Sequence, residues 1–163
     1  MCFPNFKIER NKKLGVYNFS SVFKNLEDCQ TLWKVFGSEG NFLEILQNQK
    51  VRVSKKPWVF WVNDKTKEIT IFVDYLKKCP KKILYLDCIH ELVHVKQMME
   101  GRELFDNKFT YVDRQTEIEA YVITATEAKK IGMKRKEIAD YLSVEWATKQ
   151  ENKRLIETVL AKV

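Results

Sequence analysis

The sequence predicts an α+β fold in which a small antiparallel sheet packs on helices, and three observations support this prediction. Residues 51–53, 58–62 and 69–73 are rich in β-branched and aromatic side chains, as strands are. Residues 80–100 and 114–131 instead repeat apolar side chains at helical spacing. A chain of 163 residues without an internal repeat or a low-complexity tract suits one domain, residues 1–163.

The first half of the chain is predicted to supply helices that pack behind the sheet. Apolar residues recur at helical spacing between Leu26 and Phe36, and Ser38 is suited to cap a short helix that ends near Asn48. Residues 63–67 then read as a hairpin connection between two strands. Four aromatic residues in or beside the strands are expected mainly in the sheet core, although they could instead shape pockets at the sheet edge: Trp58, Phe60, Trp61 and Phe72.

Residues 80–100 are predicted to form one helix. Pro80 suits its first turn, and Gly101 suits the position just beyond its end. Between them, apolar residues recur at helical spacing, among them Ile83, Leu86 and Ile89. This helix carries the most informative motif of the chain.

The motif is His90-Glu91-Leu92-Val93-His94, and it contains the two histidines of the chain. Because a helix turns once in about 3.6 residues, His90 and His94 lie on one face and can bind the same metal ion. Glu91 is rotated by about 100° from His90, so its carboxylate can reach a water molecule on the metal rather than the metal. The motif therefore predicts a catalytic zinc site with Glu91 as general base, although a pair of ordinary helix histidines remains the alternative.

A catalytic zinc ion usually has three protein ligands, so a third must come from elsewhere in the chain. No histidine remains, and three carboxylates compete: Glu100, Glu117 and Glu119. Glu100 points away from the metal unless its helix bends sharply. Glu117 and Glu119 open the second helix, residues 114–131, where Glu117 lies on a face of small residues and Glu119 on a face that looks solvated. Glu117 is the favoured third ligand.

Together, these two motifs resemble the gluzincin arrangement of zincin-like peptidases, in which an HExxH helix is completed by a glutamate helix. The likeness spans about residues 68–131 and is greatest to minimal, single-domain gluzincins. It implies a zincin-like fold, in which residues 69–73, the strand before the metal helix, would form the edge of the cleft, with Zn²⁺ held by His90, His94 and Glu117. It also implies that Tyr121, one turn after Glu117, orients a zinc-binding histidine.

The chain departs from thermolysin-like gluzincins at two positions. Those enzymes have a carboxylate where this chain has Tyr121, and a downstream histidine that stabilises the oxyanion. A tyrosine or an arginine would have to stabilise the developing negative charge here. Tyr111, Arg114 and Tyr141 are the candidates, and the sequence does not choose among them.

The function that follows is hydrolysis of peptide bonds in a peptide or protein substrate by a zinc metallopeptidase. Two alternatives remain: a latent or non-catalytic regulatory protein of zincin-like fold, and a zinc protease associated with nucleic acid. The intact Glu91 argues against the first. A net charge of +7 can attract nucleic acid, but lysine pairs among acidic residues indicate a solvated exterior, and no recognition motif accompanies them.

Residues 134–163 are predicted to be helical, with an interruption near Ser143, which could cap a last helix from Val144. The apolar residues of this segment favour completion of the core. The alternative, by resemblance to the latent state of some minimal gluzincins, is that the segment covers the cleft and holds the enzyme inactive.

The spacing of the cysteines and the hydropathy of the chain indicate in which compartment the protein is expected. Cys2, Cys29, Cys79 and Cys88 form no CxxC pair, so free thiols are expected rather than a zinc ribbon or a redox motif. The chain shows no apolar run of 18 residues and no signal-peptide pattern. A cytoplasmic location is the expectation.

Overall fold

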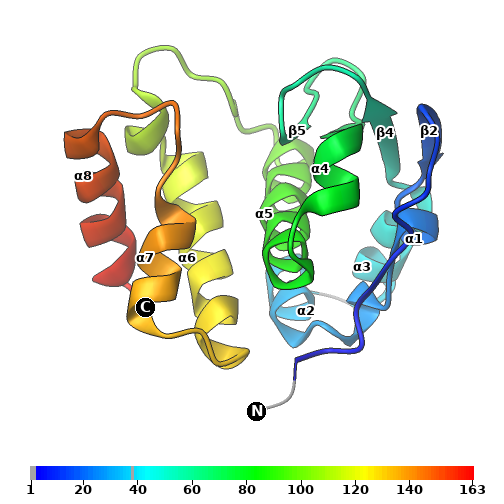
Figure 1. Cartoon of the computed structure of the whole chain (residues 1–163), viewed down its shortest axis with the longest axis horizontal. Helices are drawn as coiled ribbons and strands as arrows, with labels where there is room; N and C mark the ends of the chain where they lie inside the picture. The colour runs from blue at the N-terminus through cyan, green and yellow to red at the C-terminus, as the bar shows by residue number, and fades with distance from the viewer. Residues whose placement is uncertain (1–2, 38) are drawn as a thin grey trace.

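The structure, a computed structural model, describes residues 3–37 and 39–163, and it confirms the α+β class. A four-stranded sheet with short helices stands on one side, and a group of three helices stands on the other (Figure 1). The long helix α5 (Lys81–Met99) lies between them (Figure 1). The three helices of the second group are α6 (Gln115–Lys130), α7 (Arg135–Leu142) and α8 (Lys149–Leu160).

The main sheet has the strand order β2-β4-β6-β5. Its strands are β2 (Gly15–Asn18), β4 (Lys50–Ser54), β5 (Phe60–Val62) and β6 (Ile69–Phe72). Two of the strand pairs are antiparallel, but β4 and β6 run parallel, with Val51 opposite Ile69. The sheet is therefore mixed, and the prediction of an antiparallel sheet was wrong for this pair. Apolar alternation is the same in both kinds of pairing, so the sequence pattern could not distinguish them.

The parallel pair arises from the position of β5. After β4 the chain passes to the far side of β6, forms β5, and returns through a hairpin that inserts β6 between β4 and β5. The side chain of Asn63 holds this hairpin by accepting hydrogen bonds from the backbone of Lys65 and Thr66 at 3.0 and 3.1 Å. We expected residues 69–73 at the cleft edge of the sheet. The edge is instead β5, because β6 is an interior strand.

The remaining N-terminal elements surround the sheet. They are β1 (Lys7–Ile8), α1 (Phe19–Val22), β3 (Phe23–Lys24), α2 (Gln30–Phe36), α3 (Glu39–Asn48) and α4 (Val73–Lys78). Strands β1 and β3 form a second, two-stranded antiparallel sheet that was not predicted. The expected helices near 26–36 and up to Asn48 correspond to α2 and α3, whereas the expected cap Ser38 lies outside the described residues.

Helix α5 is buried on nearly all sides because the sheet packs against one face and α6 against another. It begins after Pro80 and ends before Gly101, whose φ of 75° is the left-handed conformation that glycine adopts without strain. These ends agree with the predicted helix, residues 80–100. The polar residues near its middle are therefore enclosed, and each needs a partner or a function.

The C-terminal segment completes the core and carries one correction. Side chains of α7 and α8 such as Ile138, Leu142 and Leu155 are buried. Ser143 ends α7 instead of starting the last helix. The cap of α8 is Thr148, which accepts a hydrogen bond from the backbone of Glu151 at 3.2 Å while the Glu151 carboxylate accepts one from the backbone of Thr148 at 2.8 Å. This reciprocal Thr-x-x-Glu pair is a stronger start signal than an isolated serine.

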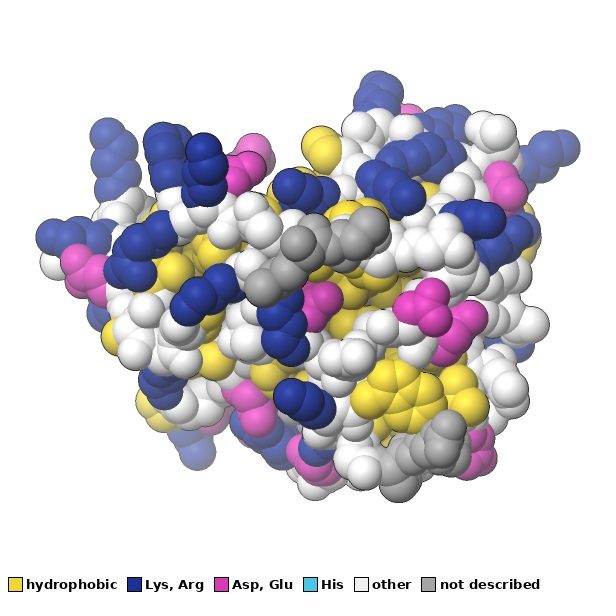
Figure 2. Space-filling view, turned by 90° about the horizontal axis from the view of Figure 1, so that it is seen from below, with side chains coloured by type: hydrophobic (Ala, Val, Ile, Leu, Met, Phe, Trp, Pro, Cys, Tyr) yellow, Lys and Arg dark blue, Asp and Glu magenta, His cyan; other side chains and the backbone are white. Residues whose placement is uncertain are grey.

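Cys29, Cys79 and Cys88 are buried free thiols, as predicted, and Cys2 lies outside the described residues. Within the described ranges, none of the helices has the combination of length and apolar character that crossing a bilayer requires. Lysine and arginine side chains are spread over the face seen in Figure 2, with acidic side chains between them. This distribution agrees with a solvated exterior.

Candidate metal centre

The centre forms where α5 and α6 pack side by side in opposite directions. Gln97 near the end of α5 donates a hydrogen bond to the backbone of Thr116 near the start of α6, at 3.0 Å. Tyr85 in the first half of α5 donates one to Glu127 in the second half of α6, at 2.8 Å. This pairing places the start of α6 beside the second half of α5, and so brings Glu117 to the histidine motif.

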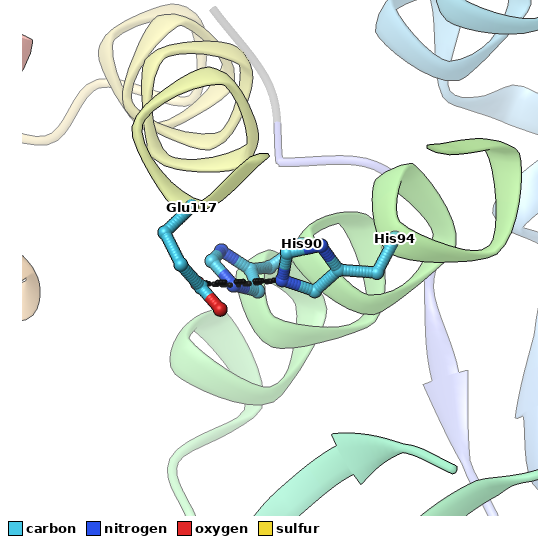
Figure 3. Close-up of side chains that lie close together, drawn as sticks. All are labelled: His90, His94 and Glu117. Atoms are coloured by element: carbon cyan, nitrogen blue, oxygen red, sulfur yellow. Dashed lines mark hydrogen bonds and ion pairs between the residues drawn. The ribbon is translucent and has the colours of Figure 1, made fainter. Parts of the chain in front are cut away.

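The structure brings together the three predicted ligands. His90 and His94 project from successive turns of α5, and Glu117 points toward both from α6 (Figure 3). The Nε2 atoms of the two imidazoles lie 3.0 Å apart, and the Glu117 Oε2 lies 3.2 Å from that of His90 and 3.3 Å from that of His94. All three side chains are buried. We refer to these residues as the triad.

The distances of the triad fit a bound metal ion. In a tetrahedral zinc site with bonds of about 2.0–2.1 Å, neighbouring ligand atoms are about 3.3 Å apart. The three atoms face one another at close to this separation. In addition, Glu117 Oε2 is buried without a well-oriented hydrogen bond from any described residue. Such a group can hold a metal ion, and the donor atoms alone do not fix which one.

The electrostatics of the triad follow from its burial. Burial opposes the charge of Glu117, but the two adjacent imidazoles lower the pKa of its carboxyl below the usual range. Burial lowers the pKa of His90. Burial also acts to lower that of His94, but the Glu117 carboxylate outweighs it and raises the pKa to about 9. The carboxylate is therefore negative and well placed to attract a cation, whether a proton or a metal ion.

Gln97 fixes the orientation of His94, and the sequence analysis did not identify this role. The Nδ1 of His94 lies 2.7 Å from Gln97 Oε1. The amide nitrogen of Gln97 donates to the Thr116 carbonyl at 3.0 Å and to the Glu119 carboxylate at 2.7 Å. Its position three residues after His94, on the same helix face, was the available signal.

Glu91 lies outside the triad and has no metal-ligating role in this geometry. It is 6% exposed, and its Oε2 has no hydrogen-bond partner among the described residues. Burial raises the pKa of this carboxyl to about 8. A buried carboxylate oxygen without a partner is costly, and a carboxyl with a raised pKa beside a cavity is a candidate functional group.

The other two carboxylates that competed for the third ligand position are not in the triad. Glu119 accepts hydrogen bonds from Gln97 and from Arg102 at the surface. Glu100 forms an exposed ion pair with Lys96 on its own helix. Glu119 is exposed, as predicted, and its carboxylate also supports the residue that orients His94.

The four residues considered for orienting a histidine or for stabilising developing negative charge occupy different places. The Tyr121 ring packs on His90 with centroids 4.4 Å apart, and its hydroxyl lies 2.9 Å from that of Tyr111. Tyr111 and Arg114 both line the cavity at the triad. Tyr141 donates a hydrogen bond to Asp87 at 3.0 Å, which occupies its proton. Tyr121 thus touches a triad histidine through its ring rather than through a hydrogen bond.

A cavity of about 630 Å³ opens at the triad. Its lining includes β5 with the residues just before it, among them the exposed Trp58, and also Phe105 and Trp146. Three of the four aromatic residues expected mainly in the sheet core, Trp58, Phe60 and Trp61, line this cavity. Trp146, in the loop between α7 and α8, packs on Tyr111 and places the C-terminal segment at the entrance.

Comparison with known proteins found no relative of the chain. No protein-family model, no curated protein and no solved structure matches the chain.

Proposed function

We propose that this protein is a zinc-dependent metallopeptidase of the gluzincin type. The observation that carries the proposal is a buried triad of two imidazoles and a carboxylate, with a second buried carboxylate, Glu91, next to His90 and a cavity in front of both. His₂Glu is a ligand set of catalytic zinc, and it leaves a coordination position for water or substrate. A purely structural zinc site would have four protein ligands.

In this function each residue has one task. When bound, Zn²⁺ would lower the pKa of water toward neutrality and polarise a carbonyl oxygen. Glu91 accepts the proton of the attacking water on its carboxylate and passes it to the nitrogen of the departing amine. Its burial favours this task, because a carboxylate whose pKa is raised is a stronger base than one in water.

Tyr111 is the proposed donor to the negative charge that develops on the carbonyl oxygen. Its hydroxyl adjoins that of Tyr121, and Tyr111 borders the cavity beside the triad. Tyr141 is a weaker candidate because its hydroxyl is engaged by Asp87. Arg114 lines the same cavity, and its Nε donates a hydrogen bond to the Asp106 carbonyl at 3.3 Å.

The edge strand β5 is suited to position an extended peptide. It pairs with β6 on one side, and no strand of the described chain pairs with its other side. Residues of β5 line the cavity next to the triad. An extended segment that adds to such an edge gains backbone hydrogen bonds and presents alternate side chains to the cavity.

The test combines metal content with peptide cleavage. Wild type, Glu91→Gln and His94→Ala are purified without metal affinity resin, loaded with Zn²⁺ and dialysed, with Glu100→Gln as a matched charge control. We expect one zinc per chain in wild type, Glu91→Gln and Glu100→Gln, and loss of zinc in His94→Ala. Cleavage of a peptide library should fall by about 10²–10⁴-fold in Glu91→Gln and persist in Glu100→Gln. Zinc without cleavage in wild type would favour the non-catalytic alternative, and a wild type that binds no metal would refute the proposal.

A further inference from the structure

Two cavities meet at the centre of the molecule. The first, described above, extends from Glu91 toward the end of α5 and includes His94. The second, of about 810 Å³, extends from Glu91 toward the start of α5 and includes Asp87 and Lys82. They share six lining residues, among them His90, Glu91 and Tyr111. A polypeptide that passes Glu91 can therefore place side chains in both cavities at once.

The first cavity, which we call the apolar cavity, is built to hold a large hydrophobic side chain. Its walls contain Trp58, Trp61, Phe105 and Trp146, and apart from the triad and Glu91 its charged residue is Arg114. Trp58 and Trp146 are 69% and 63% exposed, far more than is usual for tryptophan. Exposed aromatic side chains gathered around a cavity indicate a surface that is covered by a ligand.

The second cavity, which we call the acidic cavity, has the opposite character. Apart from Glu91, four carboxylates line it against one lysine: Asp87, Glu137, Asp140 and Glu145 face it together with Lys82. Its lining also includes the Tyr75 and Tyr141 side chains, whose hydroxyls donate to the two oxygens of Asp87 at 2.5 and 3.0 Å. These bonds hold Asp87 in place and do not neutralise its charge.

Buried groups at the junction show that the acidic cavity is more than a surface cluster of acids. Glu91 and His90 both line it, and each is 6% exposed. Glu91 Oε2 and His90 Nδ1 have no hydrogen-bond partner among the described residues. Unpartnered buried polar atoms at a cavity wall indicate that the cavity is completed by a polar ligand or by water.

We propose that the substrate is a polypeptide segment with a large apolar side chain on one side of the cleaved bond and a lysine or arginine on the other. The apolar side chain occupies the apolar cavity, and the basic side chain occupies the acidic cavity. This inference rests on the proposed peptidase function and adds its substrate class. Charge complementarity identifies the basic residue. Four carboxylates and the Lys82 ammonium group line that cavity, and carboxylates remain in excess even though Asp140 also pairs with Lys136 at 2.8 Å.

The test uses quenched fluorescent peptides that differ at two positions. One position is phenylalanine, and the other is lysine, glutamine or glutamate. Each peptide is made in both orders, because the two cavities do not fix the direction of the chain. For zinc-loaded wild type, in the favoured order, we expect kcat/KM for the lysine peptide to exceed that for the glutamate peptide about tenfold or more at low salt. The ratio should shrink in 0.5 M NaCl, because the Debye length falls from about 10 Å at 0.1 M to about 4 Å and exposed charges are then screened.

Variants at the acidic cavity separate charge from folding. The double change Asp140→Asn with Glu145→Gln should reduce the lysine preference about fivefold and change cleavage of the glutamine peptide less than that of the lysine peptide, as expected for the loss of two exposed charge contacts. The matched control removes two exposed carboxylates elsewhere, Glu44→Gln with Asp64→Asn, and should retain the full preference. Equal cleavage of lysine and glutamate peptides in both orders would overturn the inference and leave the peptidase function standing.

The inference remains testable if no peptide is cleaved, an outcome that would instead count against the proposed function. Fluorescein-labelled versions of the same peptides are then titrated into the zinc-loaded Glu91→Gln protein. Tighter binding of the lysine peptide, weakened by the double change at Asp140 and Glu145, would support the acidic cavity as a basic side-chain site. Equal dissociation constants for the lysine and glutamate peptides would refute it.

Discussion

The Nδ1 atom of His94 lies 2.7 Å from the Oε1 atom of Gln97. The amide nitrogen of Gln97 is already donating to Thr116 and Glu119, so its oxygen faces His94 as an acceptor. His94 therefore carries a proton on Nδ1. In its neutral form it presents the lone pair of Nε2 to the triad, as a metal ligand must.

Replacement of this glutamine should weaken metal binding without removing a ligand. We expect Gln97→Ala to lower zinc affinity about 10–100-fold, because His94 loses the partner that fixes its tautomer and ring orientation. Competition with a chromogenic chelator measures the affinity. Gln47→Ala, at an exposed position of α3, is the control and should leave the affinity unchanged. If Gln97→Ala binds zinc as tightly as wild type, the hydrogen bond to His94 does not support the site.

Replacement of the three carboxylates that competed for the third ligand position should weaken zinc binding to different extents, in a fixed order. Glu117→Gln should abolish stoichiometric zinc binding, because its Oε2 belongs to the triad. Glu119→Gln should weaken binding less, since Glu119 acts only through Gln97. Glu100→Gln should have no effect, as its carboxylate forms an exposed ion pair. Metal analysis after dialysis gives the order, and stronger loss in Glu119→Gln than in Glu117→Gln would contradict the assignment.

Asp87 should make the stability of the protein depend on pH. Burial raises the pKa of Asp87 to about 6, although hydrogen bonds from Tyr75 and Tyr141 act to lower it. In the unfolded chain its pKa is about 3.9. Between these values the folded state holds a proton that the unfolded state has lost, so the free energy of unfolding should fall as the pH rises from about 4 to about 6.

Comparison with Asp87→Asn isolates this contribution from that of other carboxyl groups. From pH 4 to pH 6, the free energy of unfolding of wild type should fall by about 1–3 kcal/mol relative to that of Asp87→Asn. The difference between the two proteins should stay constant above about pH 7. Urea unfolding at each pH, on metal-free protein, gives the values. A difference that is the same at every pH would show that Asp87 has an ordinary pKa.

Local periodicity was enough to predict the parts of the site that lie on helices. The spacing of His90 and His94 and the small-residue face that contains Glu117 follow from 3.6 residues per turn, and the ends of α5 and α6 agree with the prediction to within one residue. The parallel pairing of β4 with β6 could not be predicted in the same way. It depends on which strand of the hairpin lies in the interior of the sheet. Contacts between elements distant in sequence decide this.

The cavities also lay beyond the sequence. Trp146 and Phe105 come from loops outside the predicted helices and strands, and the fold brings them to the same cavity as β5. Gln97 could have been found from its spacing, but a buried glutamine with three hydrogen bonds looks like any other helix glutamine until its neighbours are known. Long-range contacts, not local propensity, decide these features.

Away from the metal centre, Glu127 should be a main source of stability. This buried residue of α6 accepts hydrogen bonds from Tyr85 of α5 at 2.8 Å and from Thr31 of α2 at 2.6 Å, and so joins three helices. Glu127→Ala should lower the free energy of unfolding by about 3 kcal/mol, since it leaves two buried hydroxyls without their acceptor and opens a cavity.

Urea unfolding of the metal-free protein measures this loss, with Glu44→Ala on α3 as an exposed control that should change stability by no more than about 0.5 kcal/mol. Tyr85→Phe, which removes one of the two donors, should cost about 1 kcal/mol. Zinc affinity should be the same in all three variants when they are folded, because Glu127 lies more than two helical turns beyond Glu117 on α6. A Glu127→Ala protein as stable as wild type would mean that α2, α5 and α6 are held together by their apolar contacts alone.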